Sequence, residues 1–316
     1  MTIASTMHKP FDVAALGEAM IEFNQTHPGQ PQYLQGFGGD TSNAAIAAAR
    51  AGATTAYLTR LGQDLFGDAL QALWQHEGVD TEAVERDAQA HTAVYFVTHG
   101  EQGHQFSYLR AGSAASRMTT AWVQSEPVRT RIAQSQMLHV SGISLALSTT
   151  ACEAALAAMR LAREAQTLVS FDSNLRLKLW SLETARTAIE QAVGLCDVFL
   201  PSLEDITQLT GLTDPHAIVD WGHRLGARAV VLKLGAEGAL VSNGQQRAEI
   251  PGHRVALVDA TGAGDCFCGN LLARLTQGDD VFAAARYANV AASLAVQGFG
   301  AVAPLPTAAQ VKAVLA

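Results

Sequence analysis

The chain has 316 residues, 48% of them apolar and 16% charged, and a formal net charge of −8. This composition indicates a globular protein with a sizeable core, built as one large α/β domain or two modest ones. The acidic balance argues against a general nucleic-acid surface, which needs a basic face, and no apolar stretch approaches the roughly 20 residues of a membrane span. We therefore expect no nucleic-acid or membrane partner.

The cysteines and the N-terminus fit a cytoplasmic protein. The apolar run near the N-terminus is broken by Asp12 and Glu18, which argues against a secretory signal. The four cysteines lack the spacing of a disulfide framework, and the last two are not separated by the two-residue gap of common zinc sites. We expect buried, reduced thiols at Cys152, Cys196, Cys266 and Cys268.

In chain order, the first third alternates expected strands (11–16, 20–23 and 54–59) with expected helices (43–51 and 64–77). The Gly-rich segment 36–43 reads as a loop that opens the first, Ala-rich helix, where main-chain donors can meet polar ligand groups. A plain loop with Ser42 or Asn43 capping the helix explains the same residues equally well.

Two β-type runs, 91–98 and 104–109, are joined by turn-like residues 99–103 and predict a hairpin. Because a hairpin of this kind cannot lie in a parallel sheet, we expect a separate small β element. Tyr95, Tyr108 and Arg110 lie on these runs and could face a ligand. A tyrosine on a half-buried strand nevertheless packs against its neighbours more often than it binds a ligand.

From residue 137 the alternation resumes. Expected strands are 137–140, 167–171, 197–200, 229–233, 239–242 and 247–250; expected helices are 148–166, 181–195, 203–210, 215–226, 264–277 and 279–297, the last two closing the chain. This pattern predicts a doubly wound, mostly parallel sheet with helices on both faces and ligands at the carboxyl ends of its strands. We expect a single domain over 1–316, with a separate small β element from about 20–37 and 91–110.

The stretch 259–267, Asp-Ala-Thr-Gly-Ala-Gly-Asp-Cys-Phe, follows the apolar run 255–258 and predicts a strand-to-helix junction. Small residues there let a ligand approach the backbone, and the unpaired amides of a helix start attract anions. Asp265 would repel an anion, so it is more sensibly a base aimed at a hydroxyl, kept ionised by the helix N-terminus. A glycine turn with Asp265 as a helix cap is the alternative.

This stretch resembles the C-terminal signature of the ribokinase-like (PfkB) carbohydrate kinases. The resemblance implies that Asp265 is the catalytic base and that the amides of Gly262, Ala263, Gly264 and Asp265 form an anion hole.

The pattern Gly-Gly-Asp-x-x-Asn at 38–43 is similar to the N-terminal substrate motif of that family. This similarity implies that Gly38, Gly39 and Asn43 contact sugar hydroxyls, with Asp40 as a weaker candidate. Glu22 lies where family members often place a substrate-binding acid, although glutamate is more usual at the surface.

Three further segments, 17–23, 141–146 and 171–180, resemble the 2-keto-3-deoxygluconate kinases of the family. The resemblance implies that Arg110 and Arg176 bind the carboxylate of a sugar acid. A planar guanidinium binds a carboxylate bidentately, whereas a neutral hexose offers it no such partner. A solvated loop in which Arg176 pairs with Asp172 is at least as good an explanation on chemistry alone.

The chain has no P-loop pattern, but 233–238 resembles the ATP-side loop of the family. That implies ATP contacts at Lys233, Gly235, Gly238, Gly262, Gly264 and Asn289, although a lysine at a strand end is more often solvated. Relatives carry Pro-Asn-x-x-Glu where this chain has Pro201-Ser202-Leu203-Glu204-Asp205. We therefore keep Asp205 only as a residue near magnesium, since Mg²⁺ usually retains several waters.

Together these resemblances imply ATP- and Mg²⁺-dependent phosphorylation of 2-dehydro-3-deoxy-D-gluconate at its 6-hydroxyl. The alternatives are a kinase for another sugar or sugar acid, such as fructose or 2-dehydro-3-deoxygalactonate, and a non-catalytic sugar-acid sensor. The resemblance also implies that the small β element of 20–37 and 91–110 is a β lid over the sugar site. Relatives commonly pair through their lids, and an exposed hairpin edge offers a template for pairing, so we expect a homo-oligomer.

Overall fold

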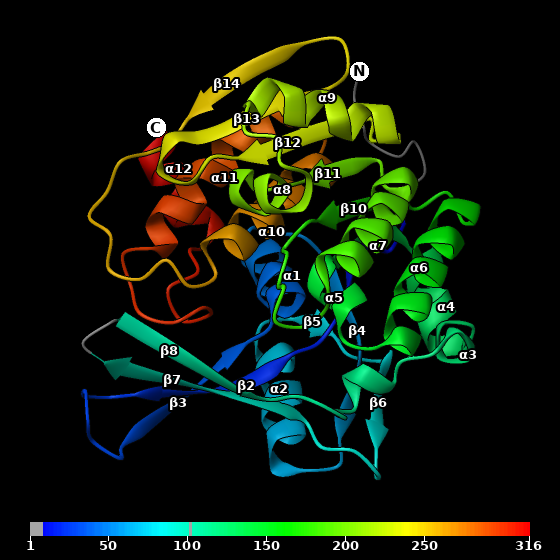
Figure 1. Cartoon of the computed structure of the whole chain (residues 1–316), viewed down its shortest axis with the longest axis vertical. Coiled ribbons are helices and arrows are strands. Elements are labelled where there is room, and N and C mark those ends of the chain that lie inside the picture. The colour runs from blue at the N-terminus through cyan, green and yellow to red at the C-terminus, as the bar shows by residue number, and fades with distance from the viewer. Residues whose placement is uncertain (1–8, 101–102) are drawn as a thin grey trace.

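The computed structural model describes residues 9–100 and 103–316, which form two sheets with helices packed around the larger one (Figure 1). The larger sheet has ten strands in the order β14-β13-β12-β11-β10-β9-β1-β4-β5, with β6 paired to β4. Its strands are β1 (Phe11–Leu16), β4 (Thr55–Gly62), β5 (Val79–Asp80), β6 (Val84–Asp87), β9 (Ser135–Ser141), β10 (Leu168–Asp172), β11 (Val198–Leu200), β12 (Ala229–Lys233), β13 (Gly238–Ser242) and β14 (Arg247–Pro251). Neighbours are parallel except where β13 pairs with β12 and β14.

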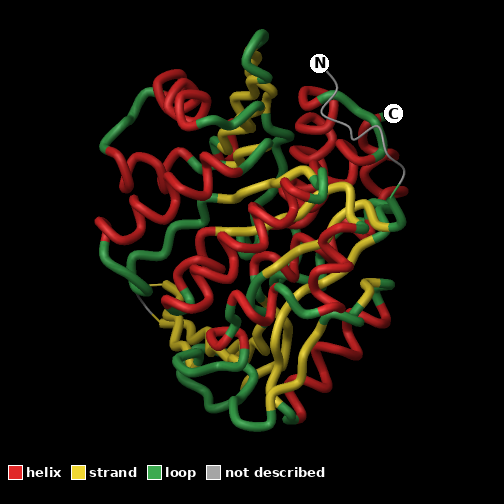
Figure 2. Tube along the Cα trace, turned by 90° about the vertical axis from the view of Figure 1, so that its right-hand side faces the viewer, coloured by secondary structure: helices red, strands yellow, loops and turns green. Residues whose placement is uncertain are grey.

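Helices cover both faces of this sheet (Figure 2). One face carries α3 (Thr120–Val123), α4 (Glu126–Ala133), α5 (Gly142–Ala146), α6 (Thr149–Glu164), α7 (Leu182–Leu195), α8 (Leu203–Thr210) and α9 (Pro215–Leu225). The other carries α1 (Asp40–Arg50), α2 (Leu65–His76), α10 (Ala263–Thr276), α11 (Val281–Ala295) and α12 (Ala308–Leu315). In the described part of the chain no helix has both the length and the apolar character needed to cross a bilayer.

Alternate residues of each central strand feed the two faces. In β12, Val230 and Leu232 pack with the α6–α9 side, whereas Ala229 and Val231 pack with α10 and α11. Strands buried on both faces read as continuous apolar runs, which is why their positions were visible in the sequence. The predicted doubly wound sheet is confirmed.

A second sheet has four strands in the order β3-β2-β7-β8 and lies below the main body in Figure 1. It comprises β2 (Met20–Gln25), β3 (Tyr33–Gly38), β7 (Ala93–Gly100) and β8 (Gly103–Leu109). The antiparallel β7–β8 pair is the predicted hairpin, although residues 101 and 102 of its expected turn lie outside the described residues. This small sheet fits a lid.

Several boundaries differ from the expectations. Residues 255–258 form no strand; they lie in a loop that leaves Leu257 68% exposed. Part of the expected Gly-rich loop is strand β3, and α1 begins at Asp40, so that Gly39 and not Ser42 or Asn43 is its N-cap. The chain closes on a third helix, α12, which is short and held by a capping box between Thr307 and Gln310.

The carboxyl ends of the parallel strands meet along one edge of the large sheet. The chain leaves β1 for β4 on one side and returns through β9 on the other, so this edge has a switch point between β1 and β9. Such a point is where open α/β sheets bind ligands. Three strands end there at Ser141, Asp172 and Lys233, and two more are followed, two residues on, by Glu18 and Ser202.

Candidate active site

Asp265 lies in the first turn of α10, over the carboxyl edge of the sheet. Burial, together with the charge of the neighbouring Asp40 carboxylate, raises the pKa of Asp265 to about 7. Asn43 opposes the shift by donating from Nδ2 to Asp265 Oδ2 at 2.8 Å. The expectation that the helix N-terminus keeps Asp265 ionised at neutral pH is not met in full, because desolvation of the carboxylate is the larger effect. A carboxyl group that titrates near neutrality is suited to accept a proton.

The turn that precedes Asp265 leaves amides available. Gly262 caps α10 with a positive φ of 75°, which a side chain would strain. The Ala263 amide is already used, since it donates to Ala260 O at 3.2 Å. Within the described residues, the amides of Gly264 and Asp265 make no backbone hydrogen bond to the preceding loop. Of the predicted anion hole, these two amides are the donors best placed at the helix start.

Lys233 is not solvated. Its Nζ lies 2.8 Å from both carboxylate oxygens of Asp172, and its side chain is only 14% exposed. Burial acts to lower the pKa of Lys233, but the Asp172 carboxylate overrides it and leaves the pKa raised. A Cβ added to Gly264 would lie 3.7 Å from Nζ, so this cation sits beside the start of α10.

The pairing of Lys233 with Asp172 also corrects the proposed pairing of Arg176 with Asp172. Asp172 and Asn174 are buried, and Asn174 Nδ2 donates to Asp40 Oδ2 at 2.9 Å. Arg176 is exposed, donates to Leu175 O at 2.7 Å, and acts on Asp40 through its charge. The segment is therefore a buried polar cluster with one exposed cation at its end, and not a solvated loop.

Arg110 follows β8 and is held by Glu18, which the sequence did not indicate as a site residue. Arg110 Nη2 lies 2.6 Å from Glu18 Oε2, and the side chains are 11% and 1% exposed. The contact is close but not aligned as a hydrogen bond, and Arg110 Nε is buried with no acceptor in the described part of the chain. The signal for Glu18 was its position two residues after the end of the first strand.

The lid reaches the site through Tyr95 and Glu22. Tyr95 is buried and its hydroxyl donates to Glu22 Oε2, so it packs within the lid, and its contact with the sugar stays a prediction. Burial raises the pKa of Glu22, which is 4% exposed and not a surface residue. Tyr108 stacks on Tyr95 with ring centroids 5.8 Å apart and keeps 41% of its surface exposed.

The two glycines of the N-terminal motif are required by the chain itself. A Cβ at Gly38 would lie 2.5 Å from the Tyr95 hydroxyl, and one at Gly39 would lie 2.4 Å from Glu18 O. Gly39 also has a φ of 113°. Their small size thus lets the lid and the β1–β2 turn close on the start of α1.

On the expected nucleotide side, Gly235 and Gly238 flank a short helical turn after β12, and both have positive φ. A Cβ at Gly238 would lie 2.1 Å from Ile250 O, so the hairpin packing requires this glycine. Asn289 of α11 uses Nδ2 to bond Ile250 O at 3.1 Å and Pro251 O at 3.2 Å. These contacts fix the end of β14 next to α11.

The variant segment at 201–205 forms a normal helix start. Ser202 caps α8 by accepting from the Asp205 amide at 3.1 Å, the role that asparagine also fills well at such positions. Asp205 Oδ2 accepts from Ser173 Oγ at 2.7 Å. Among the described residues, no group of three or more His, Cys, Asp or Glu side chains is arranged to hold a metal.

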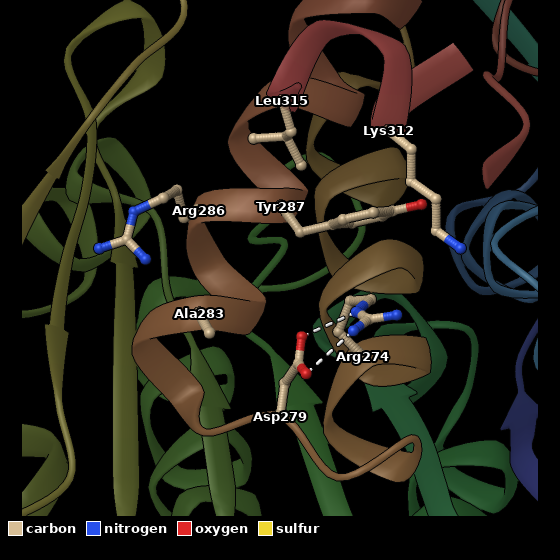
Figure 3. Close-up of a pocket in the computed structure, with 7 residues that line it drawn as sticks. All are labelled: Arg274, Asp279, Ala283, Arg286, Tyr287, Lys312 and Leu315. Carbon is tan, nitrogen blue, oxygen red and sulfur yellow. Dashed lines mark hydrogen bonds and ion pairs between the residues drawn. The ribbon is translucent and has the colours of Figure 1, made fainter. Parts of the chain in front are cut away.

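A separate hollow of about 250 Å³ lies between α10, α11 and α12, lined by Arg274, Asp279, Ala283, Arg286, Tyr287, Lys312 and Leu315 (Figure 3). Arg274 is already held by Asp279, with Nε–Oδ2 at 2.8 Å. The hollow lies near the C-terminal end of α10, nine residues from Asp265, or about 14 Å along the axis. It is therefore not part of the site described above.

The family model described as "pfkB family carbohydrate kinase" matches residues 11–308 of this chain. The chain belongs to this family. It is 32% identical over 304 residues to a 2-dehydro-3-deoxygluconokinase from Dickeya dadantii, which covers 93% of this chain and 97% of that protein. It is 34% identical over 316 residues to Fructokinase-1 from Oryza sativa subsp. japonica, which covers 95% and 96%.

Solved structures agree with the fold. The PfkB protein from Polaromonas sp. JS666 superposes with a TM-score of 0.87 at 34% identity, over 96% of this chain and 99% of that one. A fructokinase from Xylella fastidiosa with bound ATP gives a TM-score of 0.87 at 26% identity, over 96% and 98%. The resemblance to carbohydrate kinases inferred from 259–267 is confirmed. The similar proteins include both 2-dehydro-3-deoxygluconokinases and fructokinases.

Proposed function

We propose that this carbohydrate kinase catalyses the ATP-dependent phosphorylation of 2-dehydro-3-deoxy-D-gluconate at its 6-hydroxyl, giving the 6-phosphate and ADP. The observation that carries the proposal is the buried Asp265 carboxyl at the start of α10, beside the amides of Gly264 and Asp265. Asp265 accepts the hydroxyl proton while the sugar oxygen attacks the γ-phosphoryl group in line and ADP departs. The amides and Lys233 supply donors and positive charge for the phosphoryl oxygens.

Two loops offer a place for the nucleotide. Asp259 Oδ2 accepts from the Gly300 amide at 2.9 Å, which ties the loop before α10 to the loop after α11. These loops expose three large apolar side chains, Leu257, Val258 and Phe299. Apolar side chains beside fixed polar groups are the usual lining of a site for a flat organic ring such as adenine.

Mg²⁺ is a hard cation that takes oxygen ligands. Asp205 Oδ2 is an oxygen donor of this kind near the expected position of the phosphates. We propose that Asp205 lies near Mg²⁺ through water. Bound Mg²⁺ would neutralise phosphate charge. The Ser173 hydroxyl orients the Asp205 carboxylate for this role.

The sugar-acid substrate is supported by Arg176. Arg176 is exposed, and its positive charge acts electrostatically on the Asp40 carboxyl group. Among the described residues it forms no ion pair with a carboxylate. A guanidinium that is free and at the mouth of the site suits a substrate carboxylate. The similarity to the Dickeya dadantii 2-dehydro-3-deoxygluconokinase supports the same choice.

A neutral sugar such as fructose is the second candidate, and one observation favours it. Arg110, the other guanidinium expected to bind the acid, is already neutralised by Glu18. The fructokinase relatives are as similar to this chain as the gluconate-derivative kinases. The free Arg176 thus favours the sugar acid, and the neutralised Arg110 favours the neutral sugar.

A panel of sugars and sugar acids in a coupled assay for ADP decides between them. We expect the highest kcat/KM with 2-dehydro-3-deoxy-D-gluconate. Arg176→Ala should raise the KM for this sugar acid at least about tenfold, the effect of losing one charged contact, without changing the KM for ATP. Arg224→Ala, which removes an exposed arginine on α9, is the matched control. Equal effects of Arg176→Ala on both KM values would remove its role at the carboxylate.

We also propose that the whole chain acts as one kinase unit that pairs through its small sheet. The edge strand β8 exposes Phe106, Tyr108 and Leu109 by 39%, 41% and 59%. An exposed apolar edge is a template for a second copy. Sedimentation velocity of the native chain should give a dimer or larger species that Leu109→Asp weakens; a monomer at all concentrations would contradict pairing.

A further inference from the structure

We propose that Glu18 determines the charge specificity of the sugar site: it holds Arg110 in an ion pair, so that a sugar acid engages Arg110 only with uptake of a proton that neutralises Glu18. The inference rests on the sugar site proposed above and concerns how that site treats a charged substrate. In the balanced step, the Glu18–Arg110 pair, the substrate carboxylate and one proton become a substrate–Arg110 pair and a neutral Glu18 carboxylic acid.

The ion pair is built into the fold. Glu18 follows β1 at the carboxyl edge of the sheet and is 1% exposed, so its carboxylate cannot be compensated by bulk water. Arg110 Nη2 lies 2.6 Å from its Oε2, and Ser113 Oγ donates to its Oε1 at 2.5 Å. Among the described residues, Arg110 is the one cation in ion-pair contact with this buried carboxylate. Removing it is strongly unfavourable unless Glu18 takes up a proton.

The other groups that act on Glu18 do not replace Arg110. Asp40 is a second carboxyl group nearby, and Tyr57 is a buried hydroxyl that bonds Thr41 Oγ1 at 3.0 Å. Neither carries positive charge. Burial raises the pKa of Glu18 even with Arg110 in place, which brings its protonation closer to neutral pH.

Arg110 retains capacity for one more oxygen. Its Nε is buried without an acceptor in the described residues, which is a costly state that a ligand oxygen would relieve. A neutral sugar hydroxyl can fill that position and leave the ion pair intact. A sugar acid instead brings another carboxylate against Glu18 and Asp40, and one guanidinium cannot neutralise them all. Only the acid therefore requires the extra proton.

The test compares the native enzyme with Glu18→Gln, which preserves size and hydrogen bonding but removes the charge. We expect the ratio of kcat/KM for 2-dehydro-3-deoxy-D-gluconate to kcat/KM for fructose to rise at least about tenfold at pH 8. Glu77→Gln is the matched control, because Glu77 forms a half-buried ion pair with Arg50 (2.7 Å) away from the site. It should leave the ratio unchanged. An unchanged ratio in a folded Glu18→Gln enzyme would overturn the inference.

The native enzyme provides a second measurement that does not depend on the variant's folding. The measured quantity is the ratio of the KM of the acid, or of its inhibition constant against fructose, to the KM of fructose. Between pH 6 and 8.5 this ratio should rise by up to about tenfold per pH unit. Using the ratio cancels the titration of Asp265, which both substrates share. A ratio that is flat with pH contradicts proton uptake.

The two proposals fail separately. An enzyme that turns over only fructose sinks the sugar-acid function, but the inference then still predicts that Glu18→Gln binds the acid at least about tenfold more tightly than the native protein at pH 8. If the native enzyme prefers the acid and Glu18→Gln does not alter that preference, the function stands and the role of Glu18 is refuted.

Discussion

Replacing Asn43 by alanine removes the side-chain hydrogen bond to the proposed catalytic base. Asn43 Nδ2 donates to Asp265 Oδ2 at 2.8 Å, and Asn43 is 3% exposed. This bond stabilises the ionised form of Asp265 against burial and against the charge of Asp40. Asn43→Ala should therefore raise the pKa of Asp265 and shift the acidic limb of the pH–rate profile upward.

The size of the shift follows from the strength of the bond. A hydrogen bond to a charged group contributes about 1.5–3 kcal/mol, and water entering the vacated space offsets part of it, so the pKa rises by about one unit. Starting from a pKa of about 7, the ionised fraction at pH 6.5 falls about eightfold, whereas at pH 9 it falls by only about a tenth. Any loss of a sugar contact by Asn43 would add a factor that does not depend on pH.

The measurement is kcat/KM for the sugar from pH 5.5 to 9.5, because this parameter reports the free enzyme. Asn270→Ala is the control. Asn270 is buried in α10, the helix that carries Asp265, but it donates to Cys266 O at 2.9 Å and makes no hydrogen bond to Asp265 within the described part of the chain. Its acidic limb should match that of the native enzyme. The reasoning is refuted if Asn43→Ala leaves the midpoint unchanged or lowers it, or if the native limb lies near pH 4.

Two further predictions concern stability. Lys233→Met should destabilise the fold by about 3–5 kcal/mol in urea unfolding at pH 7.5, because it leaves the Asp172 carboxylate buried without its cation. The double variant with Asp172→Asn should recover most of this loss. If the losses of the two single variants simply add in the double variant, the ion pair is contradicted. Asp265→Asn should stabilise the protein at pH 8.5, on the order of 2–4 kcal/mol. The pKa of Asp265 is raised in the folded state, so the native protein loses stability as the pH rises toward 7, and the neutral asparagine avoids that loss. The gain should vanish near pH 4, and a gain that persists there would contradict its electrostatic origin.

The fold was largely predictable because its strands and helices have strong periodic signals. The βα alternation and the 91–98/104–109 hairpin were visible as apolar runs separated by turn residues. Short or half-exposed elements were not: α12 has eight residues, and the apolar run 255–258 suggested a strand where the structure has an exposed loop. An apolar run indicates burial only when tertiary contacts exist to cover it.

Within the site, residue types were predictable but their pairings were not. The sequence indicated Asp265, Asn43 and Lys233 separately, yet it could not show that Asn43 donates to Asp265, since they are 222 residues apart. The neutralisation of Arg110 by Glu18 was missed for the same reason. Long-range pairs depend on how the lid and the sheet edge meet, and no local pattern encodes that geometry.

The most direct test of the central claim is the turnover of Asp265→Asn with saturating sugar, ATP and Mg²⁺ at pH 8, followed as ADP formation and paired with a binding measurement for the sugar. A positioned base contributes about 100- to 10,000-fold to the rate. Turnover should therefore fall by at least about 100-fold, while the sugar Kd changes only a few-fold. Near-native turnover in this variant would contradict the assignment of Asp265 as the base of this carbohydrate kinase.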